Sequence, residues 1–229
     1  MLGTTRRLLG GKLASFSLVA LVAGALAGCG GSSSNGIASK SAAEILSASK
    51  AAALSASSVH LHTTSGEVVL DLKLASGGAS GHLTLSGATL EMIRIGGALY
   101  LKAPAALYQK LGINAKVPAD TWIKLSAGSV PSLAAFTEMR EQLSRLLNVA
   151  SVTKGSTTTL EGQKVVELQQ KLKVFIRSLY VAATGKPYPL ELVLKGQVAG
   201  KTTLNEWDKP VTLTAPSKSI TPEVAKTAP

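Results

Sequence analysis

The chain has 229 residues, of which 45% are hydrophobic, 16% are charged and only 4% are aromatic. The high apolar content argues against an intrinsically disordered chain, and the length suits a single domain. A lone cysteine excludes an internal disulfide framework and any CxxC metal or redox module.

The net charge of +11 comes from 24 basic and 13 acidic residues. Arg6, Arg7 and Lys12 precede the first acidic residue and belong to a segment that we expect to be removed. Without these three, 21 basic residues stand against 13 acidic ones, a net charge of +8. The remaining cations are spread singly, with no basic run beside an aromatic platform. This pattern predicts a solvated surface with weak attraction to anionic membranes and no nucleic-acid partner.

Residues 1–28 have the form of a secretory signal peptide. Basic residues at the start are followed by an uncharged apolar run, residues 13–26. A membrane-spanning helix needs about 20 such residues, so the run is too short to span comfortably. It ends in Leu26-Ala27-Gly28-Cys29, which resembles the lipobox of bacterial lipoproteins at every position.

The lipobox resemblance implies cleavage between Gly28 and Cys29 and a diacylglycerol thioether on Cys29. A cysteine suits this chemistry because its thiolate is nucleophilic enough to be alkylated by a lipid donor. Two acyl chains make a stable anchor. The mature chain is therefore expected on the extracytoplasmic face of the cell membrane, lipid-anchored through Cys29. The alternative is an ordinary signal peptide followed by an incidental cysteine.

The segment that follows, residues 29–40, is rich in Gly and Ser and predicts a flexible tether. Ser41 and Glu44 then form a capping-box pattern, which predicts a helix over residues 41–56. From Val59 the apolar residues recur with period two, which predicts antiparallel strands with one apolar and one wet face. Gly96-Gly97 predicts a two-residue hairpin between the strands around residues 93–95 and 99–101.

The second half of the chain alternates between helical and strand patterns. A short helix is predicted over residues 104–111, and a longer one from Ser129 or Ser132 to Leu147. Residues 171–180 fit either a helix or a strand. The tail, residues 217–229, is expected to fray. The predicted strands cover residues 121–125, 151–160, 163–168, 178–183, 188–195 and 201–207.

Several short stretches of this pattern resemble the actinobacterial LppX/LprG-type lipoproteins, which share the fold of the LolA and LolB lipoprotein carriers. They are residues 97–100, 121–125 and 185–190, and Trp207 with residues 210–216. The resemblance spans residues 41–216 and implies one lipid-binding-like α+β domain. Its fold is expected to be a strongly curved antiparallel sheet, an incomplete barrel, wrapped around a few helices.

The resemblance also implies an apolar cavity that holds acyl chains of lipids or lipoproteins crossing the envelope, in a monomer with no catalytic residue and no cofactor. Aliphatic walls suit that task because apolar burial is nondirectional. The alternative is that the same side chains fill an ordinary core. The predicted lining consists of Leu70, Leu72, Leu74, Leu83, Leu85, Ile93, Ile95, Leu99, Leu101, Leu133, Phe136, Leu143 and Leu147.

Other chemistries have weaker support in the sequence. His60, His62 and His82 could bind zinc or copper, but no Asp, Glu or Cys completes an obvious shell, so no metal site is predicted. The chain lacks a Gly-x-Ser-x-Gly elbow and a phosphate-binding loop, and we expect no enzyme. Trp122 and Trp207 are either ligand platforms or, by preference, plugs at a sheet edge. The charged residues Glu138, Arg140, Glu141 and Arg145 predict a solvated helix face.

Three hypotheses follow from the sequence. The favoured one is a membrane-anchored, noncatalytic lipoprotein that binds and transfers acylated lipids. The second is an envelope lipoprotein that engages another protein and has no small-molecule ligand. The third is a metal-binding lipoprotein that uses the histidines.

Overall fold

The computed structural model describes residues 33–111, 113, 117–197 and 199–222, all within one compact unit, Ser32–Pro229. Gly28 and Cys29 lie outside the described residues, as does the rest of the predicted signal peptide, so the lipidation site stays a prediction. Within the described part of the chain, no helix is both long and apolar enough to cross a membrane.

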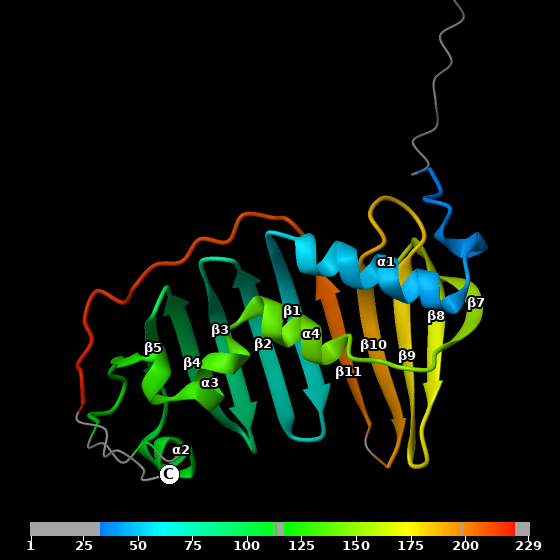
Figure 1. Ribbon diagram of the computed structural model, residues 1–229. Coiled ribbons are helices and arrows are strands. Elements are labelled where there is room, and N and C mark those ends of the chain that lie inside the picture. Colours follow the sequence, from blue (N-terminus) through cyan, green and yellow to red (C-terminus); the bar gives the residue numbers. More distant parts are fainter. Residues whose placement is uncertain (1–32, 112, 114–116, 198, 223–229) are drawn as a thin grey trace, which may run out of the picture. The chain divides into compact units, whose positions relative to one another are not determined.

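The unit is built on one antiparallel sheet of eleven strands (Figure 1). The strand order is β6-β5-β4-β3-β2-β1-β11-β10-β9-β8-β7, which leaves β6 and β7 at the two edges, so the sheet is open. The strands are β1 (Ser58–Ser65), β2 (Val68–Ala75), β3 (Gly78–Leu85), β4 (Ala88–Ile95), β5 (Ala98–Lys102), β6 (Ile123–Ser126), β7 (Thr153–Leu160), β8 (Gln163–Lys171), β9 (Phe175–Ala182), β10 (Pro189–Gly196) and β11 (Gly200–Asn205).

Two meanders make up this sheet, and β1 joins them by pairing with β11. The predicted α+β class with an unclosed antiparallel sheet is confirmed. The hairpin at Gly96-Gly97 is also confirmed, between β4 and β5. Residues 171–180, for which a helix and a strand were both open, form the end of β8, a turn and most of β9.

The helices α1, α3 and α4 lie over one face of the sheet (Figure 1). The capping box predicted for α1 is confirmed, with Ser41 Oγ accepting from the Glu44 amide and the Glu44 carboxylate accepting from the Ser41 amide. The helices are α1 (Ala42–Ser55), α2 (Ala105–Lys110), α3 (Pro131–Phe136) and α4 (Met139–Leu146), with short 3-10 turns at Ile37–Ser39 and Ala127–Ser129.

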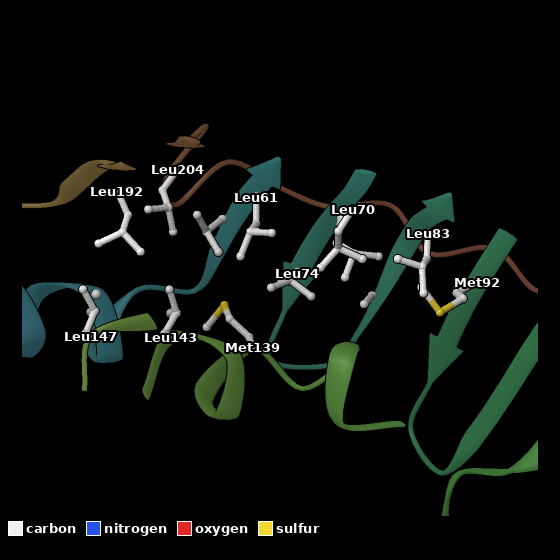
Figure 2. Close-up of a cluster of buried hydrophobic side chains, with 14 of the residues drawn as sticks. Leu61, Leu70, Leu74, Leu83, Met92, Met139, Leu143, Leu147, Leu192 and Leu204 are labelled. Carbon is white, nitrogen blue, oxygen red and sulfur yellow. The ribbon is translucent and has the colours of Figure 1, made fainter. Parts of the chain in front are cut away.

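The core lies between the helices and the sheet. Figure 2 shows leucines of the strands facing Met139, Leu143 and Leu147, which α4 and the residue after it present to the sheet. Fully burying such a side chain contributes about 1.5–3 kcal/mol. The period-two alternation is what puts these side chains on one face, because successive residues of a strand point to opposite sides of the sheet.

The single helix predicted up to Leu147 is in fact two helices, α3 and α4. The chain breaks at Thr137, whose amide and hydroxyl both donate to the Ala134 carbonyl, and at Glu138, which is extended. The Glu138 carboxylate accepts from Arg94 Nη1. Arg94 is buried on the helix-facing side of β4, so this ion pair fixes the break over the sheet.

Both ends of the described chain are more ordered than the sequence predicted. Ser34 pairs with Thr184, and the Asn35 side-chain amide donates to the carbonyls of Ala182 and Gly185. Residues 34–40 therefore belong to the folded unit and not to a flexible tether. At the other end, Ile220 in the tail expected to fray exchanges backbone hydrogen bonds with Trp122 and Lys124, beside the edge strand β6. Such pairing protects a sheet edge.

The Arg94–Glu138 pair can be tested by a double-mutant cycle. Glu138→Ala leaves the buried guanidinium uncompensated and should lower the free energy of unfolding by about 1–3 kcal/mol in denaturant titrations. Adding Arg94→Met removes that charge and should restore stability to within about 1 kcal/mol of the parent. A double variant that is less stable than Glu138→Ala alone would show that the uncompensated charge of Arg94 does not cause the loss of stability in the single variant.

Candidate functional site

A groove of about 380 Å³ lies between α1 and α4. Lys50 and Leu54 of α1 form one wall, and Leu143, Ser144 and Leu147 contribute the other. The two helices contact each other, and in Figure 1 α1 crosses the second meander of the sheet while α4 lies over β1 and its neighbours. Small-molecule sites typically measure about 300–1,000 Å³, so the groove is at the lower end of that range.

The floor of the groove is continuous with the apolar core. Leu143 and Leu147 are 0% and 2% exposed, and in Figure 2 they lie opposite Leu192 and Leu204 of the sheet. A ligand that displaces these two side chains therefore meets the aliphatic surface of the core. This is the environment that an acyl chain requires.

The mouth of the groove is polar. Lys50, Ser144 and Asn148 provide an ammonium, a hydroxyl and an amide there. The main chain after α4 is held to the sheet, because Arg177 Nη1 donates to the Asn148 carbonyl over 3.3 Å and Gln170 Nε2 to the Ala150 carbonyl over 2.6 Å. A polar rim over an apolar floor suits an amphiphile, and Lys50 could meet a phosphate or carboxylate.

Most residues predicted to line a cavity face the helices. Nine of them are buried in the apolar core, while Leu85 and Phe136 pack against it and are partly buried. Leu143 and Leu147 are the two that reach the groove itself. The nine are Leu70, Leu72, Leu74, Leu83, Leu99, Leu101, Leu133, Leu143 and Leu147.

Ile93 and Ile95 do not face the helices. In β4 the helix-facing residues are Leu90, Met92 and Arg94, as the pairing of Leu90 with Leu83 requires, so the two isoleucines point to the opposite side. The sequence misleads here because Arg94, a charged residue, occupies an inward position. Its compensation by Glu138 cannot be seen from the strand alone.

The second meander supplies the rest of the helix-facing wall, which the predicted lining omitted. The same period-two alternation could have identified it. Its inward side chains are Val166 and Leu168 of β8, Leu179 and Val181 of β9, Leu192 of β10 and Leu204 of β11. The α1 wall, Lys50 and Leu54, has no such pattern, because α1 is mostly Ala and Ser.

The histidines lie on the opposite face of the sheet. His60 Nε2 and His62 Nδ1 each lie 2.9 Å from one carboxylate oxygen of Asp71, and His82 stands opposite Asp71 in the next strand. Burial would raise the pKa of Asp71, but the hydrogen bonds from both histidines outweigh it and hold that pKa below its usual value. Within the described residues, no three His, Cys, Asp or Glu side chains are arranged to hold a metal ion.

The tryptophans do not line the groove. Trp207 stacks on Tyr188 with ring centroids 4.5 Å apart, and its indole N–H donates to the Pro189 carbonyl. Trp122 lines a shallow pocket of about 480 Å³ on the histidine-bearing face, together with His82 and Glu91. The pocket mixes charged and apolar groups, so it suits an acyl chain less well than the groove does.

Replacing Asp71 should have a pH-dependent effect. Asp71→Asn weakens both histidine contacts and should lower the free energy of unfolding by about 1 kcal/mol near neutral pH. Because the folded-state pKa lies below the unfolded value of about 3.9, the contribution is complete above that value and is lost as the pH falls through the folded pKa. Denaturant titrations should therefore converge for the two proteins in acid. A difference that persists at about pH 2 would contradict this origin.

The amino-acid sequence matches no protein-family model and has no significant match among curated proteins. Solved structures do match. LprF from Mycobacterium bovis superposes with a TM-score of 0.56 at 15% identity, over 77% of this chain and 97% of that one. The lipoprotein LppX of Mycobacterium tuberculosis gives a TM-score of 0.52 at 14% identity, over 75% of this chain and 99% of that one. The resemblance predicted from the sequence is thus confirmed for the fold: the chain has the architecture of LprF and LppX.

Proposed function

We propose that the mature chain is a noncatalytic, lipid-anchored envelope lipoprotein that binds acylated lipids through the groove between α1 and α4. One observation carries the proposal: the floor of this groove is formed by Leu143 and Leu147, whose side chains pack against the leucine-rich face of the sheet. The fold shared with LprF and with the lipoprotein LppX supports it. The lipobox-like residues 26–29 support the anchor.

Lipid entry is expected to involve movement of α4. The groove measures about 380 Å³, and the core beside it is closely packed. α4 has only eight residues and is joined to α3 by the non-helical pair Thr137–Glu138. An outward shift of α4 would enlarge the groove while the sheet stays fixed. Each methylene that enters would contribute about 0.8 kcal/mol of transfer free energy.

Blocking the groove tests ligand binding. The fragment Ser32–Pro229, secreted into a bacterial envelope and purified, should carry a lipid that native mass spectrometry detects and that extracts as an acylated molecule. Ser144→Trp fills the mouth of the groove and should reduce the bound fraction at least about tenfold, since a steric block removes the whole apolar contact. Glu141→Trp, on an exposed position of the same helix outside the groove, should leave binding unchanged.

Two results would count against lipid binding. One is a clean mass without adduct, both as purified and after incubation with envelope extract, which would favour a lipoprotein that engages other proteins. The other is equal loss of lipid in both tryptophan variants, which would show that the α1–α4 groove is not the binding site.

The anchor can be tested separately at Cys29. The full chain, expressed in a bacterium with a lipoprotein pathway, should partition into the detergent phase and yield an N-terminal peptide that carries a diacylglyceryl group on Cys29. Cys29→Ser removes the thiolate that is alkylated, so the protein should lose the modification and move to the aqueous phase or remain unprocessed. A wild-type chain cleaved near this position with an unmodified Cys29 would instead establish an ordinary signal peptide.

A further inference from the structure

The turn between β8 and β9 exposes aliphatic side chains. We call residues 171–176 the hairpin tip. In it, Leu172, Val174 and Ile176 are 43%, 48% and 39% exposed. Elsewhere in the described chain, only two large hydrophobic residues, Val68 and Ile220, are exposed to a similar degree, and neither belongs to this hairpin. Three such residues within five positions form a cluster, which calls for an explanation that single exposed residues do not.

The hairpin tip has a defined backbone conformation and is not a frayed end. The Leu172 amide donates to the Phe175 carbonyl over 2.9 Å, and the Gln197 amide donates to the Val174 carbonyl over 3.1 Å. Gly196 allows this second contact, because at its φ of +135° a Cβ would lie 2.4 Å from the Val174 carbonyl oxygen. The backbone is therefore held from two sides while the aliphatic side chains point outward.

Cations surround these aliphatic groups. Lys171 and Lys173 alternate with them along the tip, and Ile176 stands in register between Lys171 of β8 and Lys195 of β10. No Asp or Glu occurs in residues 168–190 or 192–205. None of the ion pairs between described residues includes these three lysines, whereas Lys102, Lys186 and Lys201 are each paired with a carboxylate.

We propose that the hairpin tip docks on an anionic lipid bilayer, with Leu172 and Val174 entering the interfacial region and the three lysines contacting lipid phosphates. Aliphatic groups combined with basic residues are the pair of features that gives binding to such surfaces. A groove on a partner protein would bind a contiguous apolar surface, whereas in the hairpin tip lysines are interleaved with the aliphatic residues. The tip lies at the start of β9, whereas Thr184, which pairs with Ser34, follows the other end of that strand. Docking of the tip does not depend on lipid binding in the groove.

A fluorescent label reports whether the tip enters a membrane. The fragment Ser32–Pro229 contains the whole sheet and its core, and it has no cysteine because the only one in the chain is Cys29. Val174→Cys can therefore carry a single NBD group, as can Thr158→Cys on the exposed strand β7. Vesicles of equal parts phosphatidylcholine and phosphatidylglycerol should increase and blue-shift the emission of the first label only. No response at position 174 would overturn the proposal.

Matched charge variants separate the tip from general electrostatic attraction. Replacing Lys171, Lys173 and Lys195 by Gln should lower the partition coefficient onto the same vesicles at least about tenfold in sedimentation assays, since each surface lysine contributes a factor of about five. The same change at the exposed Lys110, Lys164 and Lys218 lowers the net charge equally and should cost less than about twofold. Equal losses would overturn the proposal.

An uncharged variant tests the aliphatic half. Leu172→Asn combined with Val174→Asn keeps the net charge and should lower the partition coefficient about fivefold or more, because apolar insertion is lost. Soluble glycerophosphate should not compete, since it offers the phosphate without the bilayer. Both sites are exposed, and an unchanged melting temperature verifies that the variants fold. Unchanged partitioning of this variant, or equal binding to pure phosphatidylcholine, would refute docking by the tip.

Discussion

The structure depends on one requirement: the leucine-rich face of an eleven-stranded sheet must be kept from water. An antiparallel sheet can leave one face wet, but its apolar face needs a second layer. Here that layer consists of α1 and the much shorter α3 and α4, of fourteen, six and eight residues. Because three separate helices cover the sheet, grooves remain between them. The groove between α1 and α4 is one of them, and for this reason its floor is part of the core.

The same requirement explains the buried ion pair. α3 and α4 do not run as one straight helix over the sheet, because the chain bends between them at Thr137 and Glu138. The bend places a carboxylate against the apolar face, where Arg94 of β4 meets it. A charge at an inward strand position is costly unless it is paired. The pair therefore fixes where the helical layer bends, and α4 is attached to the sheet at that point.

Local patterns in the sequence predicted the parts of the fold that local physics determines. The capping box of Ser41 and Glu44 and the Gly96-Gly97 turn depend on neighbours in the sequence, and both are present. Leu70, Leu72 and Leu74 alternate cleanly with polar residues, so their face was predictable. In β4 the residues from Met92 to Ile95 do not alternate cleanly, and only pairing with β3 decides which of them face inward.

Contacts distant in the sequence account for what could not be predicted. The docking of Asn35 on Ala182 and Gly185 joins residues about 150 positions apart, and the two walls of the groove between α1 and α4 are about 90 positions apart. Nothing near Asn35 in the sequence marks it as folded, because its flanking residues are Gly and Ser. The α1 wall escaped prediction for a related reason: a helix rich in Ala and Ser has no pronounced apolar stripe to identify its inner face.

The hairpin tip illustrates a further limit of sequence patterns, and it bears on how the domain meets its surroundings. The run from Leu172 to Ile176 has the composition of a buried strand, and β-propensity alone would place it in the core. The register excludes this, because the ladder between β8 and β9 ends at Lys171 and Ile176, beyond the cover of the helices. Aliphatic residues that continue past the end of the core are exposed by the length of the hairpin and not by disorder. Since they are interleaved with lysines that take part in no ion pair between described residues, the surface that best satisfies them is both apolar and anionic, and a lipid bilayer has both properties.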